Sequence, residues 1–195
     1  MFRWCLLMTN PEIESFIKDV DRIVHDGGTE EVLTGKIAER MRNLLKADNI
    51  LPSQYLQPNP KYALYPLYIA DDESFSIAVA VWDVGQSTPV HDHGTWGVIG
   101  VVQGTEHEIQ YESPSNKHEE LIACNDRYIL QGEVVVCCST DQDLHKVECA
   151  SNDPCVGIHV YGGNIGKIER HIYDTHTGKK RVAVSHWVPV PASRQ

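Results

Sequence analysis

The segment GQSTPVHDHGTWGVIGVVQG, residues 85–104, places two histidines one residue apart between a pair of glycines. In a β-strand, residues i and i+2 point to the same face, so His91 and His93 can direct both imidazoles at one centre. Pro89 and Gly94 flank the pair, which places it near a strand end, where a site can open to solvent. The segment therefore predicts a pair of metal ligands on a strand.

A third imidazole has to come from another strand, and His145 is the best candidate. It follows a polar loop that ends at Asp143 and precedes Lys146 and Val147. Three neutral imidazoles suit Fe, Zn, Cu or Ni, and they leave coordination positions free for chemistry. A lone His-x-His pair in a β-rich protein is more often a surface or hydrogen-bonded pair, so its surroundings have to support the metal site.

The chain around this segment changes character along its length. Residues 10–49 show helical periodicity, with Asn10 and Pro11 as a helix start and Gly27–Gly28 as a break between two helices. From residue 62 to residue 161, short β-rich runs alternate with turn residues. The predicted strands are 76–82, 96–102, 108–111, 127–130, 133–138 and 156–161. This pattern predicts an all-β sandwich or barrel. The tail after Tyr173 is polar and ends in a proline-containing stretch.

Composition limits the class of protein. A chain of 195 residues with 42% hydrophobic and 23% charged residues fits one globular domain. The net charge of -10 disfavours nucleic acid and anionic membranes as partners. No apolar run approaches the roughly 20 residues that span a bilayer. None of the six cysteines forms a CxxC pair, so we expect free buried thiols in a reducing compartment and a cytoplasmic protein.

Two motifs together resemble the cupin superfamily. Residues 85–104 resemble the first cupin motif, and Gly132, followed thirteen residues later by His145, resembles the second. The resemblance implies a double-stranded β-helix, or jelly-roll barrel, over residues 52–195. We expect an N-terminal helical segment, residues 1–51, to pack on this barrel within a single domain.

One departure from the cupin pattern narrows the resemblance. Most cupins carry a glutamate metal ligand shortly after the His-x-His pair, where this chain has Gly97. A three-histidine site without a carboxylate resembles the thiol dioxygenases, which include cysteine dioxygenase and 3-mercaptopropionate dioxygenase. The resemblance implies Fe(II) held by His91, His93 and His145. It also implies addition of both atoms of O2 to the sulfur of a small carboxylated thiol, 3-mercaptopropionate or cysteine, which gives a sulfinic acid.

Residues 157–161 are similar to the Ser-x-His-x-Tyr segment of those enzymes. There a hydroxyl, an imidazole and a phenol form a hydrogen-bonded chain beside the iron. His159 and Tyr161 match this pattern, whereas Gly157 replaces the serine. The resemblance implies a catalytic role for His159 and Tyr161, and the alternative is a core pair that lines the barrel. Gly97 also matches, with one gap, the cysteine that crosslinks to the tyrosine in animal cysteine dioxygenases.

The candidate residue for substrate binding is identified by its distance along the chain from Tyr161. Arg170 lies nine residues after Tyr161, where the 3-mercaptopropionate branch carries the arginine that binds the substrate carboxylate. The alternative for Arg170 is a solvated residue in a charged run. Gln57 lies roughly where cysteine dioxygenases carry a carboxylate-binding arginine in a Tyr-x-Arg segment.

Two other function classes stay open on the sequence. One is a different metal-dependent cupin, such as an isomerase or a carbon-cleaving dioxygenase. The other is a non-catalytic cupin that binds a small molecule through structural histidines. The residues do not choose among small thiols, and they do not fix the oligomeric state.

Overall fold

The structure is a computed structural model that describes residues 10–112, 120–137, 139 and 143–192. Two helices, α1 (Pro11–Asp26) and α2 (Glu30–Leu44), precede a short 3-10 helix at Ser53–Leu56, and strands follow. The strands are β1 (Ala63–Ile69), β2 (Phe75–Trp82), β3 (Val90–His91), β4 (Gly97–Gln103), β5 (Thr105–Glu112), β6 (Ile122–Leu130), β7 (Val134–Cys137), β8 (Leu144–Cys149), β9 (Cys155–Gly162), β10 (Glu169–Tyr173) and β11 (Lys180–Val184).

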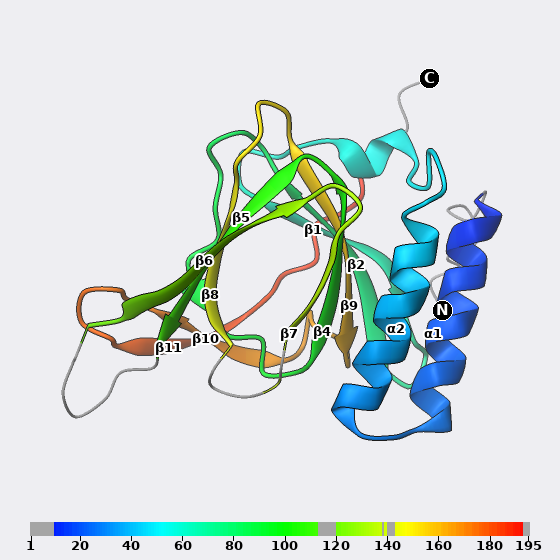
Figure 1. Ribbon diagram of the computed structural model, residues 1–195, viewed down its shortest axis with the longest axis horizontal. Coiled ribbons are helices and arrows are strands. Elements are labelled where there is room, and N and C mark those ends of the chain that lie inside the picture. The colour runs from blue at the N-terminus through cyan, green and yellow to red at the C-terminus, as the bar shows by residue number, and fades with distance from the viewer. Residues whose placement is uncertain (1–9, 113–119, 138, 140–142, 193–195) are drawn as a thin grey trace.

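The strands form two antiparallel sheets that enclose a barrel interior (Figure 1). One sheet has the order β1-β2-β9-β4-β7, and the other has the order β11-β10-β3-β8-β5-β6. The predicted fold class, a double-stranded β-helix with N-terminal helices, is confirmed. Each of the six predicted strands overlaps an observed strand. The predicted strands do not include β1, β3, β8, β10 or β11, and β11, which pairs with β10, lies in the polar tail after Tyr173.

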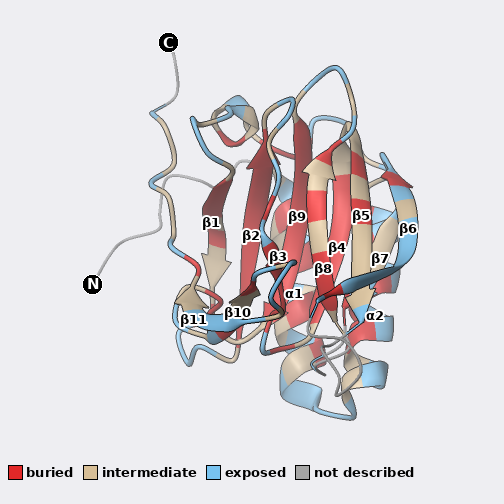
Figure 2. Ribbon diagram, turned by 90° about the vertical axis from the view of Figure 1, so that its left-hand side faces the viewer, coloured by how far each residue is buried: buried red, intermediate tan, exposed pale blue. Residues whose placement is uncertain are grey.

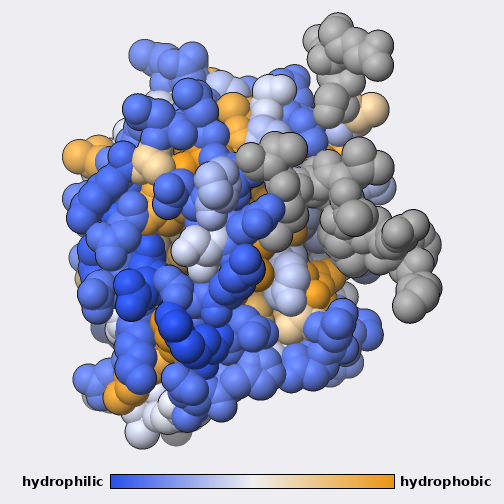
Figure 3. Space-filling view, turned by 90° about the vertical axis from the view of Figure 1, so that its right-hand side faces the viewer, coloured by the Kyte–Doolittle hydropathy of each residue, from blue (hydrophilic) through white to orange (hydrophobic). Residues whose placement is uncertain are grey.

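Helix α1 begins and ends as the sequence predicts, whereas α2 ends at Leu44, before the predicted limit at residue 49. The Asn10 side chain accepts hydrogen bonds from the backbone N–H groups of Glu12 and Ile13, and Pro11 occupies the first helical position. Gly27, with φ of 72°, ends α1 in a conformation that favours glycine. One face of α1 is apolar and buried, whereas the surface on the helix side of the molecule is mostly hydrophilic (Figure 3). No helix in the described ranges is long and apolar enough to span a membrane.

Strands β2 and β9 of the five-stranded sheet are buried on both faces, which explains their continuous apolar runs (Figure 2). Val79 and Val81 on β2 belong to the core shared with α1 and α2. Ala80 and Trp82 alternate with them and face the barrel interior. Helix α2 packs against β4 and β7, and a Cβ on Gly100 of β4 would lie 2.7 Å from Met41 of α2. The helices therefore support the back of one sheet and leave the interior to the other face.

The cysteines lie in different environments. Cys137, Cys149 and Cys155 are buried, as expected, but Cys124 is exposed on β6. This exposure contradicts the expectation of burial for Cys124, because β6 is a sheet edge with one face turned to solvent. Cys5 and Cys138 lie outside the described residues.

Candidate metal centre and substrate pocket

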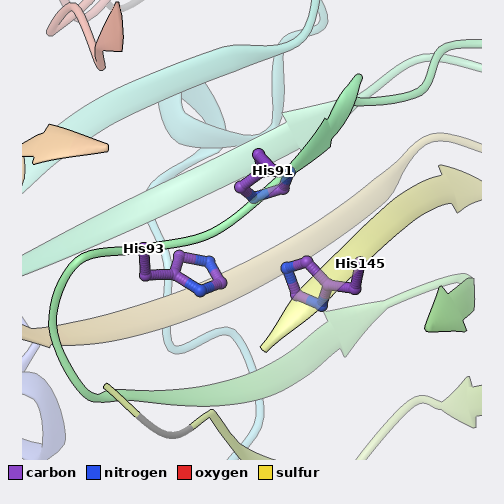
Figure 4. A group of neighbouring side chains, drawn as sticks. All are labelled: His91, His93 and His145. Carbon is purple, nitrogen blue, oxygen red and sulfur yellow. The ribbon is translucent and has the colours of Figure 1, made fainter. Parts of the chain in front are cut away.

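Three histidines meet inside the barrel (Figure 4). His91 on β3 is the cross-strand partner of His145 on β8, and His93 lies two residues beyond His91, just after β3 ends. The ring centroids are 4.7 to 5.0 Å apart, and the three rings point toward one another. Their ligand atoms all lie within 4.8 Å of one another, and all three residues are buried. This group is able to bind a metal ion.

Each imidazole is held by its Nδ1 atom. Nδ1 of His91 donates to the carbonyl of Pro89 (3.0 Å). Nδ1 of His93 donates to Asp143 Oδ2 (2.7 Å), and Nδ1 of His145 donates to Glu108 Oε1 (2.6 Å). Oxygen acceptors at Nδ1 fix the tautomer and leave every Nε2 lone pair free for a metal. The Nε2 of His145 is buried without a partner in the described structure, which fits a metal ligand.

Burial favours the neutral, metal-binding form of His91 and His93. Burial, followed by the neighbouring His145, lowers the pKa of His91 well below its usual value. Burial also lowers the pKa of His93, although the hydrogen bond to Asp143 opposes this effect. Neutral imidazoles coordinate without losing a proton first, so the donor set suits a first-row transition metal.

Glu108 connects His145 to a cation outside the pocket. Its second carboxylate oxygen pairs with Arg127, which is partly exposed. Burial raises the pKa of Glu108, but the hydrogen bonds from His145 and Arg127 outweigh burial and lower this pKa to about 2. An ionised acceptor increases the basicity of the imidazole that donates to it.

Asp92, the residue between the two histidines, points away from the metal group. Its Oδ1 accepts from the backbone N–H of His171 (2.7 Å), and its Oδ2 accepts from the Tyr173 hydroxyl (3.1 Å). His171 Nδ1 is 3.0 Å from the same oxygen. Asp92 therefore attaches β10 to the segment that carries His91 and His93.

A pocket beside the metal group collects unpartnered polar atoms. Its apolar wall consists of Leu64, Ala80, Trp82, Ile99 and Val147. Within the described residues, seven buried side-chain polar atoms have no hydrogen-bond partner, and six of them belong to residues that line this pocket. They belong to Trp82, Glu106, His145, His159, Arg170 and Ser185. Buried polar groups normally find partners, so this concentration marks a place built to receive a ligand.

His159 and Tyr161 lie together on the pocket side of β9. Nδ1 of His159 is 2.9 Å from the Tyr161 hydroxyl, and the two residues share a strand face as predicted. The Tyr161 ring is also next to the His93 ring, with centroids 5.6 Å apart. Burial lowers the pKa of His159 to about 3, and burial raises the pKa of Tyr161. Both side chains are therefore neutral near pH 7, and the phenol can act as a hydrogen-bond donor.

Arg170 is buried on β10 and lines the pocket, so it is not a solvated member of a charged run. Its Nε has no hydrogen-bond partner, and no ion pair of Arg170 occurs in the described part of the chain. Among the described pocket-lining residues, Arg170 is the one Lys or Arg side chain. Gln57 is exposed, and its amide donates to the Ser53 carbonyl away from the pocket. The described structure thus gives Gln57 no place in the site.

A comparison with known protein families shows which family this chain belongs to. The family described as "Cysteine dioxygenase type I" matches residues 66–175, which is more than half of the chain. The chain belongs to the cysteine dioxygenase type I family. The match contains all six predicted site residues, and the structure brings all six to one pocket. The individual roles of those residues stay predictions.

Solved structures similar to this family member share low identity with it. A protein from Thermus thermophilus is 18% identical, with 57% of this chain and 92% of that chain covered and a TM-score of 0.41. A Klebsiella pneumoniae protein with a double-stranded β-helix domain is 13% identical over 72% and 95% of the two chains, with a TM-score of 0.45. The oxalate decarboxylase of Lactobacillus farciminis is 16% identical over 58% and 32%, with a TM-score of 0.43.

Gly97 of this family member lies beside Tyr161. It is the cross-strand partner of Tyr161, and a Cβ on Gly97 would lie 3.4 Å from Cδ1 and Cε1 of the ring. We expect Tyr161 to remain unmodified, since no sulfur is attached at position 97. Peptide mass spectrometry of active protein checks this prediction. A two-hydrogen mass deficit in a peptide joined to Tyr161 would contradict it, and the variant Gly97→Cys tests whether the method detects such a joined peptide.

The sequence did not predict that Asp143 and Glu108 accept hydrogen bonds from the imidazoles of His93 and His145. We expect Glu108→Ala to weaken metal binding about 10- to 100-fold, because the ring of His145 loses its orienting acceptor. Competition between the protein and a chelator for the metal measures this change. Glu148→Ala is the matched control, since Glu148 lies on β8 but binds His107 and Lys146 outside the site. Equal metal affinity in both variants would show that Glu108 does not support the ligand.

Proposed function

We propose that this chain is a non-haem Fe(II) thiol dioxygenase that converts a small carboxylated thiol to its sulfinic acid. One observation carries the proposal: a buried three-histidine group without a carboxylate ligand opens on the same pocket as an unpaired arginine. Membership of the cysteine dioxygenase type I family, which is iron-dependent, supports iron as the metal.

The metal would be held by Nε2 of His91, His93 and His145, all three of which have Nδ1 occupied by an oxygen acceptor. Fe(II) at this site supplies the redox chemistry for O2 and a positive charge that favours a thiolate. A site with neutral ligands keeps more of that charge than one with a carboxylate ligand. Glycine at position 97 is therefore in keeping with a thiolate substrate.

The remaining pocket residues would bind and orient the substrate. Arg170 would hold the substrate carboxylate in a charge-assisted pair, which fits its buried and unpaired guanidinium. Tyr161 would donate a hydrogen bond into the pocket, with His159 holding its oxygen. The apolar wall excludes water and leaves room for a short carbon chain. With these contacts, the thiol would lie between the carboxylate clamp and the metal group.

The reaction balances without a further reductant. The S–H bond of the thiol breaks and two S–O bonds form from one O2. The proton stays on the sulfinic acid or passes to the solvent when this acid ionises. Both 3-mercaptopropionate and cysteine carry the thiol and carboxylate that this pocket would recognise. We propose one of these two thiols as the substrate.

The decisive experiment measures O2 consumption by anaerobically prepared, Fe(II)-loaded protein with 3-mercaptopropionate, cysteine, mercaptosuccinate and cysteamine. We expect one O2 consumed per sulfinic acid formed, with 3-mercaptopropionate or cysteine turned over fastest. Protein loaded with Zn(II) is the control and should consume no O2. Absence of uptake with every thiol would contradict the proposal and favour a different metal cupin or a non-catalytic binding protein.

A further inference from the structure

Gly157 leaves a space between two buried polar atoms that have no partner. A Cβ on Gly157 would lie 2.8 Å from His159 Nε2 and 3.1 Å from Glu106 Oε1. Neither atom has a hydrogen-bond partner in the described structure, and Glu106 is only 1% exposed. Glu106 is on β5 of the six-stranded sheet, whereas His159 is on β9 of the other sheet. The two side chains thus approach each other across the barrel interior, at the position of the missing serine.

We propose that Glu106 is a positioning residue that hydrogen-bonds to His159 Nε2, directly or through one water, and completes a Glu106–His159–Tyr161 chain. A role of this hydrogen-bonded chain in catalysis rests on the proposed thiol dioxygenase function. The proposed contact itself does not depend on that function, because it rests on two unpartnered atoms, Glu106 Oε1 and His159 Nε2, beside Gly157.

The direction of the hydrogen bonds follows from burial. Burial, followed by repulsion from Glu108, raises the pKa of Glu106 to about 8, and burial lowers the pKa of His159 to about 3. Near pH 7 a neutral carboxyl group then donates to the Nε2 lone pair of a neutral imidazole. His159 Nδ1–H donates to the Tyr161 oxygen, which is 2.9 Å away. The phenol O–H stays free to donate into the pocket, so Glu106 determines how Tyr161 presents its proton.

Glu106 and Gly157 depend on each other. With Glu106 present, any side chain at position 157 would crowd both His159 and the Glu106 carboxyl group. The glycine is therefore the counterpart of the glutamate, and the serine of the related segment is replaced by an acid from the opposite sheet. A serine at position 157 would require the His159 ring itself to shift, because its Cβ would lie 2.8 Å from Nε2 whether or not Glu106 is shortened.

Nitrogen-15 NMR of histidine-labelled, Zn(II)-loaded protein tests the contact without any turnover. We expect the wild-type His159 ring to be a single Nδ1–H tautomer and its Nε2 signal to shift in Glu106→Ala. Glu106→Gln, whose amide can also donate to Nε2, should keep the wild-type tautomer. Glu112→Gln, an exposed acid on the same strand, is the control. An unchanged His159 spectrum in Glu106→Ala would overturn the contact, and an Nε2–H tautomer in wild type would overturn the donor role.

Kinetics of the Fe(II)-loaded variants test what the contact does. Glu106→Ala should lower kcat about 10- to 100-fold, because a misplaced phenol loses its alignment, while KM changes little since Arg170 is untouched. Glu106→Gln should retain most of the activity. Thermal unfolding checks that each variant is folded. Folded Glu106→Ala with wild-type kcat would overturn the positioning role. If no variant or wild type turns over any thiol, the proposed function fails, and the NMR result still decides the contact.

Discussion

Replacing His145 by alanine is expected to remove stable iron binding and, with it, thiol turnover. The substitution deletes one of three ligands and leaves Glu108 without its imidazole partner. Loss of an outer hydrogen bond alone costs about 10- to 100-fold in metal affinity, so loss of a ligand should cost more than ~100-fold. Metal analysis after Fe(II) loading and gel filtration measures iron per chain, and the same samples give O2 uptake.

His91→Ala and His93→Ala should behave in the same way, since all three rings converge on one point. His176→Ala is the control, because His176 is an exposed turn residue. Retention of full iron content and full turnover by all three ligand variants would show that the metal site lies elsewhere.

Arg170→Ala is expected to lower kcat/KM for a carboxylated thiol by roughly ten- to a thousand-fold. The carboxylate would then enter a partly buried pocket without its cation, which costs a few kcal/mol of binding. Turnover of cysteamine should change much less, because it has no carboxylate. Steady-state O2 uptake with each thiol measures the contrast.

A matched variant separates a clamp from a fold defect. Arg181→Ala removes an exposed arginine from the neighbouring strand β11, and its kinetics should match wild type. Equal losses for 3-mercaptopropionate and cysteamine in Arg170→Ala would indicate general damage to the pocket. Unchanged turnover of both 3-mercaptopropionate and cysteine would exclude Arg170 as the carboxylate site.

The fold was predictable wherever a local pattern reports on burial. Alternation placed His159 and Tyr161 on one face of β9, and the glycines at positions 85 and 104 both adopt φ of 81°, where only glycine is relaxed. The two-residue strand β3 is too short to leave a periodic signal. Strand β11 is polar and lies at a sheet edge, so its sequence resembles a loop.

The partners of the metal ligands could not be predicted because they depend on pairing between distant strands. Glu108 reaches His145 through the register of β5 and β8, and Asp143 reaches His93 from a loop fifty residues away. The predicted strand began at residue 108, whereas β5 begins at Thr105, so Glu106 was left outside it. The sequence Glu106-His107-Glu108 did carry a usable signal. In a strand, alternation turns both carboxyl groups to one face, away from His107.

The two sheets carry different parts of the proposed chemistry. His91, His145 and Arg170 come from the six-stranded sheet, whereas His159 and Tyr161 come from the sheet that the helices support. In evolutionary terms, this separation makes metal retention and reactivity distinct inherited traits. A substitution on β9 would thus alter how the pocket handles its substrate, while the three imidazoles that would hold the metal keep their supports in the other half of the barrel.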